Sequence, residues 1–153
     1  MNEKTSIRIR KANKKDIPEL IYLLQILFTI EEDFNFDISK HKKGLKLMLS
    51  DKNRCCILVA EYQEKVVGMC TSQLLCSTAE GGLIALIEDM VIKKEYRRQG
   101  MGKLLLTAIE KWSLDKNAKR IQLLADRNNV PALEFYKKVN WDLTQLICLH
   151  KKI

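Results

Sequence analysis

Residues that build linkers, metal sites and disulfide frameworks are scarce in this sequence. Its 153 residues include 6 Gly, 2 Pro and 2 His, and no stretch is rich in Gly and Pro. The 5 Cys are odd in number and form no C-x-x-C pair, which argues against a disulfide framework and a zinc site. We therefore expect one domain over residues 1–153, no bound metal, and reduced thiols buried in strands. A reactive Cys148 is the alternative for the thiols.

Long hydrophobic runs are absent as well. No apolar stretch approaches the roughly 20 residues that span a bilayer, and Met1–Ser6 lacks the apolar core of a signal peptide. Hydrophobic residues make up 46% of the chain and charged residues 30%, which excludes a disordered polymer. We expect a soluble, cytoplasmic protein with no membrane partner.

The net charge of +8 is unevenly distributed along the chain. Segment 93–103 carries a net charge of +4, and segment 30–38 carries −4. A nucleic-acid-binding protein typically spreads its basic residues along a helix face with aromatic residues between them, and no such pattern occurs here. We therefore expect no nucleic-acid partner, and we expect the positive segment to bind a polyanionic cofactor.

Apolar periodicity predicts a mixed α/β fold. Helical spacing predicts helices over 14–30, 38–50, 102–116 and 131–138. Apolar runs predict strands over 7–10, 55–62, 66–76, 83–92, 120–125 and 143–149. Asn13 and Asp16 resemble a capping box, and Pro18 moves the expected start of the first helix a few residues later. Segment 83–92 is apolar on both faces except for two adjacent acids, as in the central strand of a sheet with helices on both faces.

The turn between segments 83–92 and 102–116 contains Arg97-Arg98-Gln99-Gly100-Met101-Gly102. Its glycines let the backbone approach a ligand, and the start of the following helix adds unpaired N–H donors and a positive dipole end. Such a turn suits a pyrophosphate. Leu104 stands where a P-loop needs Ser or Thr, and Leu105 stands where the dinucleotide fingerprint needs Gly. A plain glycine-rich turn into a core helix is the alternative.

Two motifs at a matching distance resemble the GNAT acetyltransferase superfamily. Arg97-x-x-Gly100-x-Gly102 matches the signature R/Q-x-x-G-x-G/A, and Asn129-x-x-Ala132-x-x-Phe135-Tyr136-Lys137-Lys138 resembles the family's closing helix. The stretch from Ile7 to Leu27 looks like the family's opening, so the resemblance covers nearly the whole chain. Ile87-Glu88-Asp89 looks like the equivalent strand of glucosamine-6-phosphate N-acetyltransferases. Asn140 replaces the usual Gly, and Asn tolerates the left-handed conformation that this turn requires.

The resemblance implies a fold, a cofactor and a set of cofactor contacts. The sheet would be mostly antiparallel and splayed at one parallel strand pair, with the pantetheine arm of acetyl-CoA between the two strands. An N–H near Met90 or Val91 would face the thioester oxygen, an interaction worth roughly 3 kcal/mol in other enzymes. The implied cofactor-binding residues are Met90, Val91, Ile92, Arg97, Arg98, Gln99, Gly100, Met101, Gly102, Lys103, Asn129, Ala132 and Tyr136.

The resemblance also implies two proton transfers. Glu88 and Asp89 are candidates for the base that deprotonates the amine, and strand alternation is expected to send them to opposite faces. We favour Glu88, acting directly or through a water, and simple ion pairing is the alternative. Tyr136 matches the position of the family's general acid, with a packing role as its alternative. Asn129 suits cofactor binding and helix capping equally well.

The acceptor side is indicated by the acidic residues Glu31, Glu32, Asp33 and Asp37. In the family, the stretch after the first helix walls the acceptor cleft, so Glu31, Glu32, Asp33 and Glu88 are predicted to bind a cationic amine. A solvated face or helix caps are the alternative. The predicted function is acetyl-CoA-dependent N-acetylation of a small-molecule amine in a ternary complex. A non-catalytic acetyl-CoA-binding module or a protein lysine or N-terminal acetyltransferase is the alternative, and the family also suggests a homodimer.

Overall fold

The computed structural model describes residues 6–153, so most of Met1–Ser6 and the first positions of the predicted domain lie outside the described residues. The chain forms two compact units, one ending at Gln122 and one beginning at Leu123. None of the helices in the described part of the chain is long and apolar enough to cross a bilayer.

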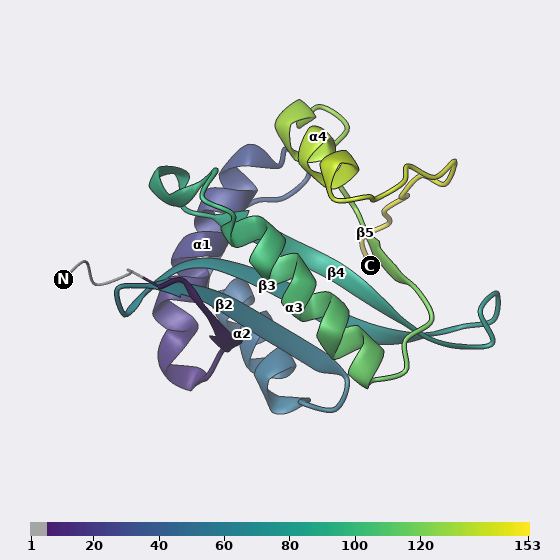
Figure 1. Ribbon diagram of the computed structural model, residues 1–153, viewed down its shortest axis with the longest axis horizontal. Coiled ribbons are helices and arrows are strands. Elements are labelled where there is room, and N and C mark those ends of the chain that lie inside the picture. Colours follow the sequence, from purple (N-terminus) through teal and green to yellow (C-terminus); the bar gives the residue numbers. More distant parts are fainter. Residues whose placement is uncertain (1–5) are drawn as a thin grey trace. The chain divides into compact units, whose positions relative to one another are not determined.

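The first unit is a sheet with helices on both faces (Figure 1). Helices α1 and α2 lie on one face of the sheet and α3 crosses the other. Its elements are β1 (Arg8–Lys11), η1 (Lys14–Asp16), α1 (Ile17–Ile30), α2 (Ile38–Ser50), β2 (Cys55–Tyr62), β3 (Lys65–Ser77), β4 (Gly82–Ile92), η2 (Lys94–Tyr96) and α3 (Met101–Asp115). β5 (Ile121–Leu123) continues into the second unit.

The strand order is β1-β2-β3-β4-β5, with antiparallel pairing from β1 to β4. The chain leading into β5 runs parallel to β4, because the Lys119 N–H donates to the Leu83 carbonyl at 2.8 Å and the Ala85 N–H donates to the Arg120 carbonyl at 2.9 Å. The predicted fold class, a mixed α/β sheet that is mostly antiparallel with helices on both faces, is confirmed.

The core forms where the predicted apolar positions meet. Leu20, Leu23 and Leu24 of α1 pack against strand residues that include Met69 and Val91. The buried residues of α3 recur at helical spacing and include Leu105, Leu106, Ile109 and Trp112. The sheet thus has an apolar layer on each face, one covered by α1 and α2 and the other by α3.

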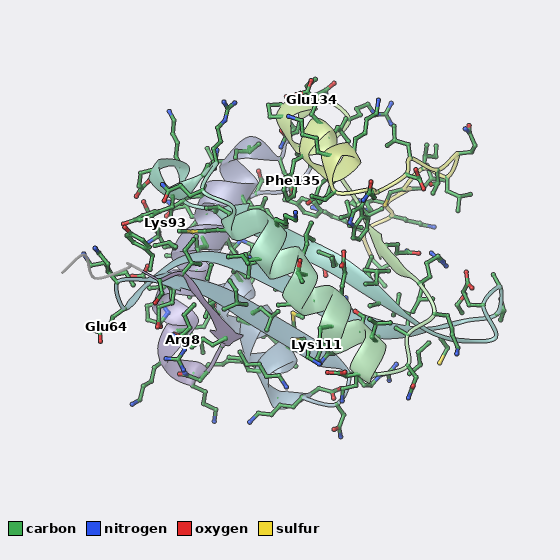
Figure 2. The ribbon with its side chains drawn as sticks, in the orientation of Figure 1. Arg8, Glu64, Lys93, Lys111, Glu134 and Phe135 are labelled. Atoms are coloured by element: carbon green, nitrogen blue, oxygen red, sulfur yellow. The ribbon has the colours of Figure 1, made fainter. Side chains whose placement is uncertain are left out.

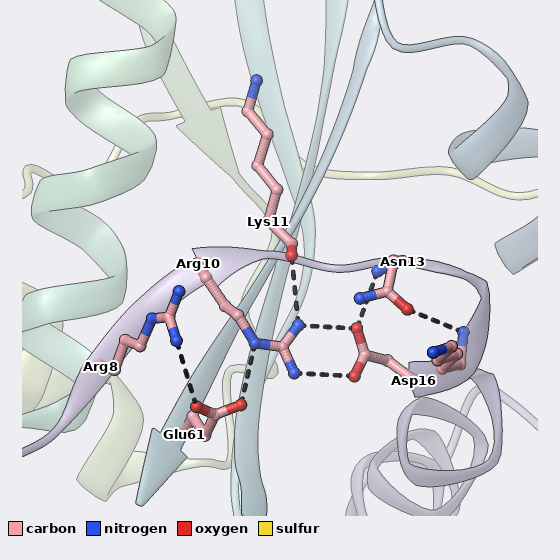
Figure 3. Close-up of polar contacts among 7 residues, drawn as sticks. Arg8, Arg10, Lys11, Asn13, Asp16 and Glu61 are labelled. Atoms are coloured by element: carbon pink, nitrogen blue, oxygen red, sulfur yellow. Dashed lines mark hydrogen bonds and ion pairs between the residues drawn. The ribbon is translucent and has the colours of Figure 1, made fainter. Parts of the chain in front are cut away.

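The chain leaves β1 through a network of polar contacts (Figure 3). Asn13 and Asp16 form the predicted capping box on η1, and α1 begins at Ile17 with Pro18 in its first turn, as predicted. Arg10 holds Asp16 with two hydrogen bonds of 2.8 and 2.9 Å and also donates to Glu61 at 2.9 Å. These contacts fasten the start of α1 to β1 and β2.

A β-bulge interrupts the pairing of β3 with β4. Cys70 lies opposite Met90 and Ser72 lies opposite Ile87, so β4 has one residue more than β3 over this stretch. Thr71 therefore faces both Glu88 and Asp89. The extra residue changes where these two acidic side chains point.

The second unit contains the end of β5 and α4 (Val130–Lys138). The Asn129 side chain caps α4 by accepting from the Ala132 N–H at 3.3 Å, and Asn140 has the expected left-handed φ of +66°. The predicted strand over 143–149 is wrong. The second unit has no strand there, and Leu143 and Leu146 are 85% and 88% exposed. A strand needs a partner for its main-chain groups, and an apolar pattern alone does not supply one.

The five cysteines are free thiols. Cys56 and Cys70 are buried, as predicted, and burial raises the pKa of both thiols. The prediction of buried thiols is wrong for Cys76 and Cys148, which are exposed. Cys76 is exposed because it lies near the end of β3, and Cys148 is exposed because its segment forms no strand.

Candidate active site

The turn from β4 into α3 has the backbone of an anion site. Arg98 and Gly100 adopt left-handed conformations, with φ of +60° and +82°. A Cβ atom on Gly100 would have nothing within 4 Å beyond Gly100 and its two chain neighbours, so the space beside this residue is open. The Leu104 N–H is bonded to the Gly100 carbonyl at 3.1 Å, so the N–H groups of Met101, Gly102 and Lys103 precede the first intrahelical bond. These three donors and the helix dipole favour a bound anion.

The predicted basic residues around this turn differ in what they contact. Arg98 and Lys103 are exposed. The Arg97 Nε donates to the Ile92 carbonyl at 2.9 Å, which braces the turn against the end of β4. Lys93, labelled in Figure 2, forms an ion pair of 3.0 Å with Glu19 and ties β4 to α1. Arg97 and Lys93 thus hold the turn in place, whereas Arg98 and Lys103 give its surface a positive charge.

Main-chain groups at the end of β4 point to two different sides. The Lys93 N–H donates to the Val67 carbonyl at 2.8 Å, so Lys93 and Val67 are a hydrogen-bonded pair. Because such pairs alternate along antiparallel strands, Val91 bonds to β3, whereas Met90 and Ile92 direct their N–H and C=O groups away from β3. Of the three residues that the resemblance implies as main-chain ligands, Met90 and Ile92 have the required orientation.

Glu88 and Asp89 lie on one face of the sheet. The Thr71 hydroxyl donates to Asp89 Oδ2 at 2.8 Å, and the Gln73 side chain donates to Glu88 Oε2 at 3.4 Å. Thr71 and Gln73 are two residues apart on β3 and so share a face. The prediction that alternation separates the two carboxylates is therefore wrong, because the bulge cancels the alternation at this point.

The environments of the two carboxylates are different. Glu88 is exposed, whereas burial raises the pKa of Asp89 from its ordinary value of 3.8 to about 6. The hydrogen bond from Thr71 opposes this rise, and the nearby charge of Glu88 adds to it. Met69 of β3 and Val91 of β4 pack against α1. Residues two apart on a strand share a face, so Thr71 lies on the same face as Met69 and Asp89 on the same face as Val91. Asp89 therefore faces the α1 side of the sheet.

The acidic segment after α1 has mixed roles. Glu32 and Asp33 are exposed and Glu31 is partly exposed. Asp37 caps α2 by accepting from the Lys40 N–H at 3.0 Å, and this bond lowers the pKa of Asp37. The capping alternative is therefore confirmed for Asp37. Phe34 and Phe36 of the same segment pack against rings of the two flanking helices: centroids are 5.6 Å apart for Phe28 and Phe34, and 5.2 Å apart for Phe36 and His41.

The remaining predicted residues belong to the second unit. Asn129 is the cap of α4, Ala132 donates to it, and Tyr136 lies within α4. The Tyr136 ring is 5.3 Å from Phe135 and 6.0 Å from Trp141, measured between centroids. The capping alternative for Asn129 is confirmed, and the same side chain also fixes where α4 begins.

Sequence reasoning missed Thr71 and Gln73, which bond to the two acids, and the aromatic rings after α1. One signal was present: Thr71-Ser72-Gln73 is a polar run inside an otherwise apolar strand. Residues 6–153 contain no cluster of His, Cys, Asp and Glu that fits a metal ion. The donors of the turn are N–H groups and cations, which fit the phosphates of a nucleotide-type cofactor.

Comparison with known proteins gives consistent matches. The sequence model of the Acetyltransferase (GNAT) family matches residues 20–141. An uncharacterized N-acetyltransferase of Archaeoglobus fulgidus is 24% identical over 132 residues, covering 85% of this chain and 89% of that protein. An aminoglycoside acetyltransferase structure from an uncultured soil metagenomic sample is 25% identical, covers 96% of each chain and has a TM-score of 0.77. An aminoglycoside N-acetyltransferase in complex with CoA shares the fold, with a TM-score of 0.86, 14% identity and coverage of 99% and 98%.

Proposed function

The chain belongs to the Acetyltransferase (GNAT) family, and we propose that it transfers an acetyl group from acetyl-CoA to a primary amine of a small molecule, by direct attack in a ternary complex. The observation that carries this proposal is the placement of two features on one strand. The candidate anion-binding turn begins where β4 ends, and the half-buried carboxyl of Asp89, with its raised pKa, lies three residues before that end. A binding module needs only the first feature, whereas an acetyltransferase also needs a base such as the second.

Acetyl-CoA, when bound, supplies an acetyl group activated as a thioester together with its leaving thiol. The N–H groups of Met101, Gly102 and Lys103 would hold its phosphates, assisted by the charge of Arg98 and by the backbone of Gln99 and Gly100. Met90 and Ile92 would provide main-chain partners beyond the phosphates. The Met90 N–H, which is directed away from β3, would stabilise an oxygen that gains negative charge.

Asp89 is the proposed base, in place of the Glu88 that the sequence alone favoured. A general base works best when its pKa lies close to the working pH, and Asp89 has a pKa of about 6. A protonated amine must lose its proton before it attacks, and the Asp89 carboxylate would accept that proton directly or through a water. Glu88, exposed on the same face, would attract and orient the cationic form of the amine.

Tyr136 is the proposed acid. A phenol has a pKa near 10, so its hydroxyl is protonated at neutral pH and is able to give a proton to a departing thiolate. The motif position of Tyr136 on α4 supports this role. Asn129 caps α4 through the Ala132 N–H and so sets where the helix that carries Tyr136 begins.

The proposed acceptor is a cationic amine. Glu31, Glu32 and Asp33 follow α1, which covers the face of the sheet that Asp89 and Glu88 occupy. These five carboxylates, in a chain with net charge +8, favour a cationic ligand. One of the similar structures is an aminoglycoside acetyltransferase, and aminoglycosides are cationic amines at neutral pH.

The test is a screen of amines for thiol release from acetyl-CoA. The panel contains spermidine, ornithine, kanamycin, an unmodified lysine peptide and glucosamine 6-phosphate. We expect amine-dependent release that is fastest with a cationic small molecule. Acetyl-CoA binding without amine-dependent release would identify a non-catalytic module, and release with the peptide alone would identify a protein acetyltransferase.

A further inference from the structure

The middle of β3 contains a buried hydroxyl that bonds twice to one residue. Thr71 is 0% exposed. Its Oγ1 accepts from the Asp89 N–H at 3.0 Å and donates to Asp89 Oδ2 at 2.8 Å. Burying a hydroxyl costs free energy unless it is hydrogen-bonded. The Thr71 hydroxyl both donates and accepts a hydrogen bond, and Asp89 is the partner in each case.

The bulge explains why this arrangement is required. Asp89 belongs to the stretch where β4 has an extra residue, so its N–H has no regular ladder partner on β3. The Thr71 hydroxyl takes the place of that partner. The same hydroxyl then holds the side chain of Asp89, so one group fixes both the backbone and the carboxylate of this residue.

We infer that Thr71 is a positioning residue for the reaction: its hydroxyl holds the Asp89 carboxylate in one orientation and favours its ionised form. This inference rests on the proposed function, in which Asp89 is the base. Thr71 itself is fully buried, so it is not accessible to a ligand in solution. Its effect on the reaction passes through Asp89 alone.

Few other groups influence the ionisation of Asp89. Glu88 is its charged neighbour on β4, and the buried Cys70 thiol is its titratable neighbour on β3. On α1, Glu19 is paired with Lys93, and Lys93 also lies over the Tyr22 ring at 5.2 Å. The charged residues of α3 lie on the opposite face of the sheet. Within residues 6–153, the hydrogen bond from the Thr71 hydroxyl is the contact that lowers the pKa of Asp89.

Removing the hydroxyl therefore changes a pH dependence. A hydrogen bond to a charged group is worth about one to two pKa units, so Thr71→Val should raise the pKa of Asp89 by that amount. More of the base is then protonated at neutral pH. We expect kcat/KM to fall roughly two- to tenfold at neutral pH and to recover at about pH 9, where Asp89 is ionised again.

The experiment compares Thr71→Val, Thr71→Ser and Ser72→Ala by two measurements. The first is the titration of the Asp89 carboxyl carbon by NMR, which requires no turnover. The second is the pH profile of kcat/KM with acetyl-CoA and spermidine. Thr71→Ser keeps the hydroxyl and should restore the wild-type behaviour. Ser72→Ala is the matched control, because Ser72 is also buried on β3 and its hydroxyl has no hydrogen-bond partner within residues 6–153.

The inference predicts that both midpoints move upward in Thr71→Val and stay in place in Thr71→Ser and Ser72→Ala. An Asp89 titration that stays in place in a folded Thr71→Val protein overturns it. A titration that moves while the kinetic midpoint stays also overturns it, because Thr71 then acts on a carboxyl that the reaction does not use. If the wild type releases no thiol with any amine, the proposed function fails, and the NMR titration still decides whether Thr71 holds Asp89.

Discussion

Ionised Asp89 lowers the stability of the fold, and the same raised pKa suits the residue to act as a base. Burial makes its charged form unfavourable, and the bulge and the Thr71 hydroxyl keep that form accessible near neutral pH. Glu88, one residue earlier, is exposed and contacts Gln73. Two adjacent carboxylates on one face are thereby suited to different tasks, the first to attracting a cation and the second to accepting a proton.

The first prediction concerns the pH dependence of the reaction. Because Asp89 has to be ionised to accept a proton, kcat/KM should rise with pH through a midpoint near the Asp89 pKa of about 6. Asp89→Asn should lower kcat by roughly 10²–10⁴, whereas Glu88→Gln should mainly raise KM for a cationic amine. Initial rates of thiol release over a range of pH measure both effects. A large loss of kcat in Glu88→Gln with normal turnover in Asp89→Asn would reverse the assignment.

The second prediction concerns stability at the same residue. The folded-state pKa of Asp89, about 6, lies above its ordinary value of 3.8, so the folded state binds the proton more tightly than the unfolded state does. The free energy of unfolding should therefore decrease as pH rises between these values. Asp89→Asn removes the half-buried charge and should be more stable than wild type above about pH 7, by up to about 3 kcal/mol. Urea denaturation at two pH values tests this, and a variant less stable at both would contradict it.

The third prediction concerns the proposed acid. Tyr136→Phe should lower kcat by roughly 10²–10⁴ and leave acetyl-CoA affinity unchanged, because the ring still packs beside Phe135 and Trp141. Steady-state kinetics and a binding titration measure the two quantities. Tyr62→Phe in β2 is the control for removal of a phenol hydroxyl elsewhere. An unchanged kcat in Tyr136→Phe would assign the residue to packing alone.

At the scale of elements, the site depends on how β4 ends and α3 begins. The left-handed φ of +82° at Gly100 turns the chain into α3, and the space beside the Gly100 Cα is open. The Arg97 contact with the Ile92 carbonyl holds that turn against β4. The end of β4, the turn and the start of α3 are therefore held together, and a backbone change in the turn should weaken cofactor binding first.

The fourth prediction tests the turn between β4 and α3. Gly100→Val should abolish the rise in Tm that acetyl-CoA produces, because the side chain would fill the open space and a β-branched residue resists a positive φ. Gly81→Val is the matched control: Gly81 also has a positive φ, of +61°, and nothing within 4 Å of a Cβ position. Both variants should lose similar stability, roughly 1–2 kcal/mol. If Gly100→Val keeps the rise in Tm, the phosphate site lies elsewhere.

Elements with a strong local pattern could be predicted from the sequence, and the details of the site could not. Helices 38–50 and 102–116 and strands 55–62 and 83–92 follow from apolar spacing, and the structure places them within one residue of the predicted bounds. The bulge at Glu88 and Asp89 arises from the register between two strands, which no local pattern encodes. The predicted strand 143–149 shows the same limit, since an apolar alternation does not specify a partner.

The candidate site divides along the same line. The turn at Gly100 and the cap at Asn129 are local features, and both are present where the sequence predicts them. The roles of Val91 and of the two acids depend on pairing with β3, and only the structure separates them. The polar run at Thr71 was visible in the sequence, but its contact with Asp89 depends on the bulge and could not be predicted from the sequence.

At the scale of the whole molecule, charge separation determines the expected acceptor. The net charge of +8 includes a segment of +4 at the turn and a segment of −4 after α1. A cofactor with phosphates and a cationic amine would each be drawn to the segment of opposite sign. The two segments thus predict which end of each ligand binds where.

The fifth prediction follows from this separation. The wild type should have a higher kcat/KM for spermidine than for glucosamine 6-phosphate, and the double variant Glu32→Gln, Asp33→Asn should reduce that ratio by roughly two- to fivefold per charge. Glu64→Gln, on the turn between β2 and β3, controls for a change of net charge. Repeating the rates at higher salt should weaken the preference. A wild type that prefers the phosphorylated amine would contradict the proposed acceptor.

The central claim is that the chain transfers acetyl groups from acetyl-CoA to an amine, and one measurement tests it most directly. Acetyl-CoA and spermidine are incubated with the protein, and free thiol and acetylated amine are quantified together, the latter by mass spectrometry. We predict that both products appear in equal amounts, that omitting the amine stops thiol release, and that Asp89→Asn suppresses both. Thiol release without acetylated amine, or no release with any amine of the panel despite acetyl-CoA binding, would contradict the claim.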